Sequence, residues 1–290
     1  MTIETALQTN ERIAELTDNL DSVITLPEVA ARIVQTINDS KSTATDLHKI
    51  ISHDPALVSR ILKRVNSSFY GRPTKIDSVE RAIVLMGFDA VNTLALSATL
   101  GQIFKPTNIS EDFTARDLWT HCVAVAAAAR EMAKRVNKQI AEEAFLAGLL
   151  HDIGLLVEMQ VCPEKLRKVC DIAKKGETSF SMAEYDLIGC NHAEIGAALA
   201  AKWGFPDYCR AAVAYHHMPA LAEPEHRQMV AIVYAADTLC AQDAIGFNLT
   251  ANNQIADSVA SEGMLPLSLI DYTRENLPQL VSDAIIVFGS

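Results

Sequence analysis

Apolar residues recur at three- and four-residue intervals along almost the whole chain. This spacing places them on one face of an α-helix, because a helical turn takes 3.6 residues. Alternating β-branched residues bounded by hairpin turns, the pattern typical of strands, are hard to find. The spacing therefore predicts an all-α fold. With 290 residues, 49% of them hydrophobic, the chain has enough apolar surface for a large helical core.

Several helix starts are marked by capping residues or proline. Pro27, Pro55 after Asp54, and Ser78 each precede an apolar helical pattern, and Gly87 separates the third helix from a fourth that starts near residue 89. Further helices are predicted at residues 115–137, 140–151, 163–175, 181–187, 192–202, 206–217, 228–241 and 267–287. The basic stripe of Arg60, Lys63 and Arg64 is expected to be a solvated helix face.

The segment 105–108, Lys-Pro-Thr-Asn, breaks the helical period and is the predicted boundary between two packed parts. Residues 1–105 are predicted to form an N-terminal helical subdomain and residues 110–245 a second one. Residues 246–290 are predicted to be a C-terminal helical extension, which could serve as a cap or a dimer surface. A homodimer is therefore an open alternative.

Acidic residues dominate the second part of the chain. Residues 1–110 hold 11 basic and 12 acidic side chains, whereas residues 111–290 hold 14 and 24. This balance disfavours nucleic acid duplexes, whose binding requires Lys and Arg to neutralise phosphates. No apolar run approaches the ~20 residues of a membrane span, so no membrane partner is expected. The six cysteines form no C-x-x-C pair and the N-terminus is acidic, which predicts a cytoplasmic protein.

Five of the eight histidines and two aspartates lie on or beside apolar helices of the second part. They are His121, His151, Asp152, His192, His216, His217 and Asp237. Asp237 lies within an apolar helix and needs a partner, because a buried unpaired charge is costly. A divalent metal, a basic side chain or a buried water cluster could each be that partner. Any one of these histidines alone is more often a satisfied core group than a ligand.

Imidazole and carboxylate ligands suit a divalent transition metal, with Fe or Mn predicted and Zn or Ni as alternatives. A helical bundle can aim such ligands inward from several helices. The dipeptide His151-Asp152 is placed where a helix is expected to end at Gly154. There the two oxygens of Asp152 could bridge two ions, which would clamp a phosphoryl group and activate a water molecule. Gly154 and Gly196 could also allow helices to approach closely.

The order of these residues, H (121), HD (151–152), H (192), HH (216–217) and D (237), each on its own helix, resembles the HD superfamily of metal-dependent phosphohydrolases. A wider likeness, over roughly residues 15–245, makes the chain similar to the HDOD domain, the HD-related output domain of bacterial signalling proteins. It is carried by DPAL (54–57), IDSVERAI (76–83), WTH (119–121), FLAGLLHDIG (145–154), HAEIGA (192–197) and WGFP (203–206). The resemblance implies an HD-like helical bundle over residues 110–245.

The HD-GYP relatives, which hydrolyse cyclic di-GMP, imply a ligand set of all seven residues. In that set Asp152 is the bridge and the catalytic position if the site is active. Asp117 is either a further ligand or a surface acid. HDOD proteins, by contrast, are commonly treated as signalling modules. Here Leu155 stands where the HD-GYP pattern has a phosphate-contacting Lys, and the GYP signature is missing after His217.

Three hypotheses follow. The preferred one is a bacterial regulatory module with an HD-type site of one metal ion or, by preference, two. It would act by binding a signalling protein partner or a nucleotide-type ligand. The alternative is a metal-dependent phosphohydrolase of a nucleotide or cyclic dinucleotide. The third is a polar network without metal. Whether such a site is active stays open at this point.

Overall fold

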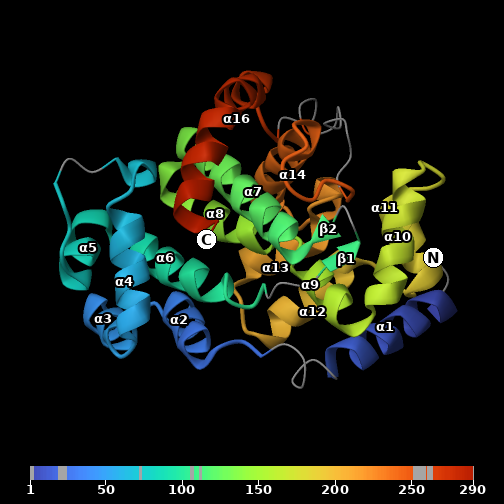
Figure 1. The fold of residues 1–290 in the computed structure, drawn as a ribbon, viewed down its shortest axis with the longest axis horizontal. Coiled ribbons are helices and arrows are strands. Elements are labelled where there is room, and N and C mark those ends of the chain that lie inside the picture. The colour runs from blue at the N-terminus through green and yellow to red at the C-terminus, as the bar shows by residue number, and fades with distance from the viewer. Residues whose placement is uncertain are drawn as a thin grey trace.

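The computed structural model describes residues 3–18, 25–71, 74–104, 108–110, 113–250, 259 and 264–289. It confirms the all-α fold (Figure 1). The exception is a short antiparallel pair of strands, β1 (Asn108–Ser110) and β2 (Phe113–Thr114). Among the described residues, no helix combines the length and the apolar character that crossing a membrane requires.

In the described residues of the first part of the chain there are six helices, joined at one point by a 3₁₀ turn. They are α1 (Ile3–Asp18), α2 (Glu28–Asn38), α3 (Ala44–Ser52), α4 (Pro55–Val65), the turn Ser68–Tyr70, α5 (Val79–Met86) and α6 (Phe88–Leu100). Figure 1 shows α2 to α6 gathered at one end of the molecule, while α1 lies at the other end. There α1 packs on α12, and Nε of Arg12 donates to the carbonyl of Ile188 (3.1 Å).

The second part supplies the remaining described helices, of which α7 and the C-terminal α16 are the longest. They are α7 (Ala115–Val136), α8 (Ala141–Leu150), α9 (Ile153–Val161), α10 (Pro163–Lys174), α11 (Phe180–Leu187), α12 (His192–Lys202), α13 (Asp207–Tyr215), α14 (Arg227–Gln242) and α16 (Leu267–Phe288). Short 3₁₀ turns cover Lys138–Ile140 and Pro219–Leu221. Helices α8, α14 and α16 pack around α7, so the middle of α7 is enclosed by protein.

The expected helix end at Gly154 is wrong. Helix α8 ends at Leu150, and α9, which the spacing did not predict, begins at Ile153 and contains Gly154. The role of Gly154 is close approach, because a Cβ there would lie 1.9 Å from the backbone oxygen of His192. His151 and Asp152 therefore stand in the short connection between two buried helices, directly against the start of α12.

The hydrophobic core is shared by elements from both parts. One buried cluster contains Ile33 of α2, Leu94 of α6, Phe145 of α8 and Phe288 of α16. The division at residues 105–108 stays a prediction, since 105–107 lie outside the described residues.

The end of α16 is held inside the molecule. The Phe288 ring lies 5.0 Å from that of Phe145, and the indole nitrogen of Trp119 donates to the Phe288 carbonyl (2.7 Å). Arg64 was expected to be solvated, which is wrong. Its guanidinium carbon lies 4.9 Å above the Phe288 ring, and its Nε donates to the carbonyl of Val287 (3.2 Å). The burial of Arg64 lowers its pKa to about 10.

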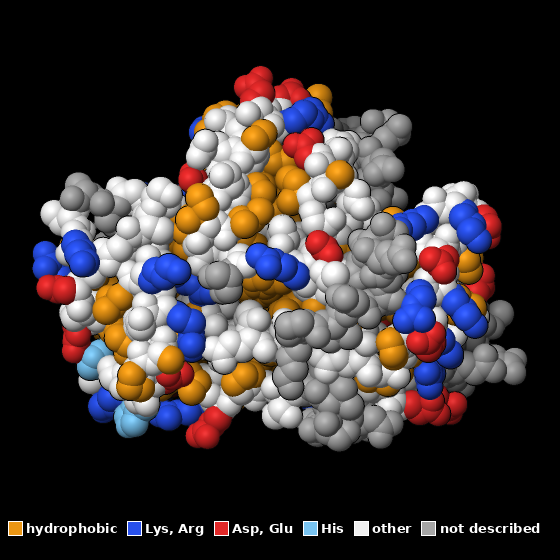
Figure 2. All heavy atoms as spheres, viewed as in Figure 1, with side chains coloured by type: hydrophobic (Ala, Val, Ile, Leu, Met, Phe, Trp, Pro, Cys, Tyr) orange, Lys and Arg blue, Asp and Glu red, His pale blue; other side chains and the backbone are white. Residues whose placement is uncertain are grey.

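The surface carries charges of both signs. Figure 2 shows Lys and Arg side chains interspersed with Asp and Glu over one face of the molecule. The described part of this face has no continuous basic stripe of the kind that binds a nucleic acid duplex.

Candidate metal centre

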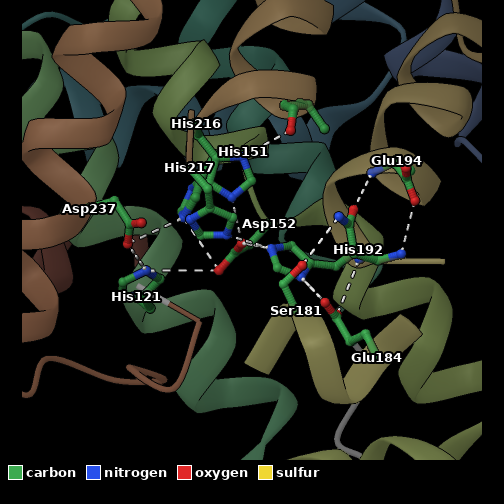
Figure 3. Close-up of polar contacts among 12 residues, drawn as sticks. His121, His151, Asp152, Ser181, Glu184, His192, Glu194, His216, His217 and Asp237 are labelled. Carbon is green, nitrogen blue, oxygen red and sulfur yellow. Dashed lines mark hydrogen bonds and ion pairs between the residues drawn. The ribbon is translucent and has the colours of Figure 1, made fainter. Parts of the chain in front are cut away.

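The seven predicted side chains converge on one buried cluster centred on Asp152 (Figure 3). Their donor atoms form two groups that share this carboxylate. One group is His121, His151 and Asp152; the other is Asp152, His192, His216 and His217. Asp152, His151 and His216 are fully buried. Helices α7, α12 and α14, the end of α13 and the α8–α9 connection thus deliver these side chains to a single point, although 116 positions separate His121 from Asp237.

Each oxygen of Asp152 faces a different group of histidines. Oδ1 lies 3.5 Å from Nε2 of His192 and 3.4 Å from Nε2 of His216. Oδ2 lies 3.3 Å from Nε2 of His151 and 3.9 Å from Nε2 of His121. A carboxylate with one oxygen on each side has the geometry of a bridge between two sites.

Backbone carbonyls fix three of the imidazole rings from behind. Nδ1 of His151 lies 2.7 Å from the Gly148 carbonyl, and Nδ1 of His216 lies 2.9 Å from the Val213 carbonyl. Because a carbonyl can only accept, each Nδ1 carries a proton, and Nε2 is the nitrogen that faces the cluster. His121 is held in the same way by the Ile245 carbonyl, 3.2 Å away.

Asp237 completes the His121 side of the cluster. Its Oδ1 lies 3.0 Å from Nε2 of His121 and 3.8 Å from Nε2 of His151. The loop after α14 crosses α7 closely at Gly246, where φ is +64° and a Cβ would lie 2.4 Å from the Asp117 carbonyl oxygen. Only glycine fits such a crossing without strain, and the crossing is what places the Ile245 carbonyl on His121.

Two buried glutamates that were not predicted from the sequence, Glu158 and Glu184, lie behind His192. Nδ1 of His192 lies 2.8 Å and 3.0 Å from the two oxygens of Glu184, and its backbone N–H donates to Oε1 (3.2 Å). Glu158 is fully buried beside Glu184. Burial raises the pKa of both carboxyl groups, and at Glu158 the neighbouring Glu184 adds to the rise. A carboxylate behind a histidine sets the tautomer and orientation of the ring.

The position of Glu158 could have been found by the argument applied to Asp237. It is an acid inside the apolar helix α9, Ile153–Val161, and such an acid needs a partner. Glu184 gives no comparable signal, because α11 is short and mixed in character.

Replacing Glu184 by Gln is expected to weaken metal binding on the His192 side by about 10- to 100-fold, because the supporting carboxylate is lost. Competition between Mn²⁺ and a fluorescent chelator measures this affinity. Asp186→Asn, an exposed acid on the same helix, is the matched control and should leave the affinity unchanged. Equal affinity in Glu184→Gln and the wild type would show that His192 does not depend on Glu184.

The protonation states suit metal ligation on the Oδ1 side. Burial lowers the pKa of His192 and His216, and burial together with these two neighbours holds the pKa of His217 well below its usual range. These three imidazoles are therefore neutral at pH 7, which is the state that binds metal. Burial also opposes protonation of His151, but the Asp152 carboxylate, together with Asp237 and the Gly148 carbonyl, outweighs it and raises the pKa of His151 to about 9. A metal ion at His151 would therefore displace the proton on Nε2.

The cluster leaves polar atoms without partners. Both oxygens of Asp152 and Nε2 of His151 and His216 are buried and form no hydrogen bond within the described residues. Buried polar groups are nearly always satisfied, and orphaned ones suggest a bound ion or water. Carboxylate oxygens and imidazole nitrogens that face one point without hydrogen-bond partners are the kind of ligand set that a divalent transition metal requires. The residues present therefore fit such a metal.

Two neighbouring positions have other roles. The Asp117 carboxylate accepts from the backbone N–H of Thr114 (3.0 Å) in the capping box of α7, so it is occupied at the helix start. Leu155 is fully buried in α9 and offers no hydrogen-bond donor from its side chain. Among the described residues, every ion-pair partner of Asp152 and Asp237 is a histidine, so a phosphate there would depend on metal ions for positive charge.

Comparison with known proteins gives one family and several similar structures. The family model of the HDOD domain matches residues 23–219. An HDOD domain protein of unknown function from Geobacter sulfurreducens has a TM-score of 0.81 at 22% identity, with 96% of this chain and 99% of that one covered. A candidate phosphohydrolase from Shewanella amazonensis has a TM-score of 0.69 at 25% identity, with 95% of each chain covered. A candidate signal transduction protein from Marinobacter aquaeolei has a TM-score of 0.79 at 26% identity, with 98% of this chain and 65% of that one covered.

A curated relative is longer than this chain. An uncharacterized protein of Treponema pallidum is 28% identical over 236 residues, which are 81% of this chain and 45% of that protein. The chain therefore spans less than half the length of this relative.

Proposed function

The chain belongs to the HDOD domain family, and on this premise we propose that it is a regulatory signalling module whose His/Asp cluster binds two divalent metal ions and, through them, a phosphate-bearing ligand. The single observation that carries the proposal is the Asp152 carboxylate, buried with one oxygen on each group of histidines and with no hydrogen bond to either oxygen.

His121, His151 and Asp237 would hold one ion, and His192, His216 and His217 the other, with Asp152 between them. Fe or Mn is proposed, with Zn or Ni as alternatives. When bound, the ions supply the positive charge that attracts and polarises a phosphate. The protein's own part is to fix the rings through their Nδ1 atoms and to keep bulk water away from the buried carboxylates. The proposed partners are a signalling protein and a nucleotide-type ligand.

A second function, metal-dependent phosphohydrolase, is favoured by the same bridging geometry, since two-ion sites commonly serve phosphoester hydrolysis. The regulatory role is favoured over turnover because few cationic side chains are available to bind a phosphate. Within the described residues, Asp152 and Asp237 form ion pairs only with histidines, and the Leu155 side chain supplies no donor to a phosphate. The candidate phosphohydrolase and candidate signal transduction protein among the similar structures are compatible with either function.

The test is metal binding by protein purified without chelator or affinity metal. We expect two transition-metal ions per chain by elemental analysis, and a chelator should lower the melting temperature. At a metal concentration 100 times Kd, the bound ion stabilises the fold by about 2.7 kcal/mol, which is roughly 5–10 °C for a chain of this size. The proposal would be refuted if the purified protein contained no metal and if neither Mn²⁺ nor a chelator changed its melting temperature.

Turnover separates the two functions. If the metal-loaded chain hydrolyses p-nitrophenyl phosphate or cyclic di-GMP, and Asp152→Asn abolishes that hydrolysis, the phosphohydrolase is supported. Metal content without turnover on these esters supports the regulatory module.

A further inference from the structure

A cavity of about 610 Å³ opens beside the metal centre. It is bounded by α1, α11, α12 and the end of α13, and His217 belongs both to its wall and to the donor group around Asp152. Nε2 of His217 lies 2.9 Å from Nε2 of His192. Cavities of roughly 300–1,000 Å³ hold small organic ligands. A ligand that fills this cavity would thus contact one of the proposed metal ligands.

The wall of the cavity is almost uncharged. Its only charged side chain among the described residues is Glu194, and no Lys or Arg lines it. Ala197, Ala198 and Ala214 form a smooth apolar part of the wall. A ligand phosphate in this cavity away from the metal ions would find no cation and would face a carboxylate. Like charges held close together in a partly desolvated site repel each other strongly.

The polar part of the wall is fixed by a network of hydrogen bonds. The Tyr185 hydroxyl donates to Oε1 of Glu194 (2.8 Å), and Nδ2 of Asn191 donates to the Tyr185 oxygen (3.0 Å). The backbone N–H of Asn191 donates to Oε2 of Glu194 (3.1 Å), so both carboxylate oxygens are held. The Thr250 hydroxyl also lines the cavity, and it is buried without a hydrogen-bond partner among the residues that the structure describes. The wall therefore offers positioned polar groups to an uncharged ligand.

From this wall we propose that the ligand is a phosphomonoester of an uncharged organic group that carries both an apolar face and hydrogen-bonding groups, as a nucleoside monophosphate does. The phosphate lies at the metal ions and the organic group fills the cavity. Glu194 is the specificity-determining residue, since its charge excludes ligands with a second phosphate. This inference rests on the proposed metal centre, and it narrows the ligand from nucleotides and cyclic dinucleotides to monoesters.

The test is calorimetric binding to the Mn²⁺-loaded chain, with inorganic phosphate, AMP, ADP and cyclic di-GMP as probes. AMP should bind at least about tenfold more tightly than inorganic phosphate, because burying its organic group adds apolar contact. ADP and cyclic di-GMP should bind about tenfold more weakly than AMP. In Glu194→Gln, which keeps the capping box of α12, the difference between AMP and ADP should shrink.

Two further variants separate the cavity from the metal centre. Ala197→Leu fills the cavity and should reduce AMP affinity to that of inorganic phosphate while phosphate affinity stays unchanged. Ala201→Leu, an exposed alanine on the same helix, should change neither. Phosphate binding with no gain for AMP, or tighter binding of ADP or cyclic di-GMP, overturns the inference and leaves the metal centre standing. If the chain binds neither Mn²⁺ nor phosphate, the proposed metal centre itself is wrong.

Discussion

The substitution Asp152→Asn is expected to remove both metal ions from the chain. The amide keeps the size of the carboxylate but carries no negative charge, and one of its two ends becomes a donor that cannot ligate a metal. Because Oδ1 faces His192 and His216 while Oδ2 faces His151 and His121, both sites lose a ligand at once. We expect the metal affinity of both sites to fall by at least about 100-fold. Loss of a residue that only supports a ligand costs up to about 100-fold, and loss of a ligand itself should cost at least as much.

The measurement is elemental analysis together with Mn²⁺ titration. Asp171→Asn, an exposed acid on α10, is the matched control and should keep the wild-type metal content. Circular dichroism should show that both variants are folded. If Asp152→Asn loses one ion and keeps the other at wild-type affinity, then Asp152 serves one site only, and the bridge is wrong.

The substitution Gly154→Ala is expected to have the largest effect on stability. A Cβ at this position would lie 1.9 Å from the carbonyl oxygen and 2.7 Å from the carbonyl carbon of His192, and both belong to rigid backbone. Helices α9 and α12 must therefore move apart. Such overpacking costs about 3 kcal/mol or more, which corresponds to a melting temperature lower by roughly 10 °C in a chain of this size.

The same displacement moves Asp152 away from His192, so metal affinity should fall together with stability. Gly176→Ala is the informative comparison. Nothing lies within 4 Å of a Cβ at Gly176, but its φ of +68° is left-handed, so it should lose about 1 kcal/mol from backbone strain alone. It should also keep its metal affinity. Equal losses of stability in the two variants would contradict a steric role for Gly154.

Local sequence signals predicted most helices well. The predicted 192–202 coincides with α12, which begins with a capping box formed by Asn191 and Glu194, and Asp54 caps α4 by accepting from the Leu57 N–H (3.0 Å). Capping and apolar periodicity are local effects, so they are readable from neighbouring residues. Helix α9 was missed because it is buried all round and has no polar face to reveal a period.

The convergence of the metal centre was predicted from resemblance, and the structure brings the seven side chains together. Their role as ligands remains a proposal. Apart from the buried acid Glu158, the support around them could not be predicted, because it depends on contacts between segments that are distant in sequence. Arg64 illustrates this limit: its polar sequence neighbours favoured a solvated face, whereas the end of α16, more than 200 positions later, covers it.

If Asp152 bridges two ions as proposed, its placement between two groups of histidines would also make the occupancies of the two sites interdependent. An ion held near His151 would draw electron density from the same carboxylate that the other site uses, and it would fix the orientation of that carboxylate. Thermodynamic linkage then requires the effect to be reciprocal, so each ion changes the affinity for the other by the same factor. The two sites would therefore not fill independently as the metal concentration rises. A binding curve steeper than that of two independent sites would show positive coupling, and a shallower one would show negative coupling.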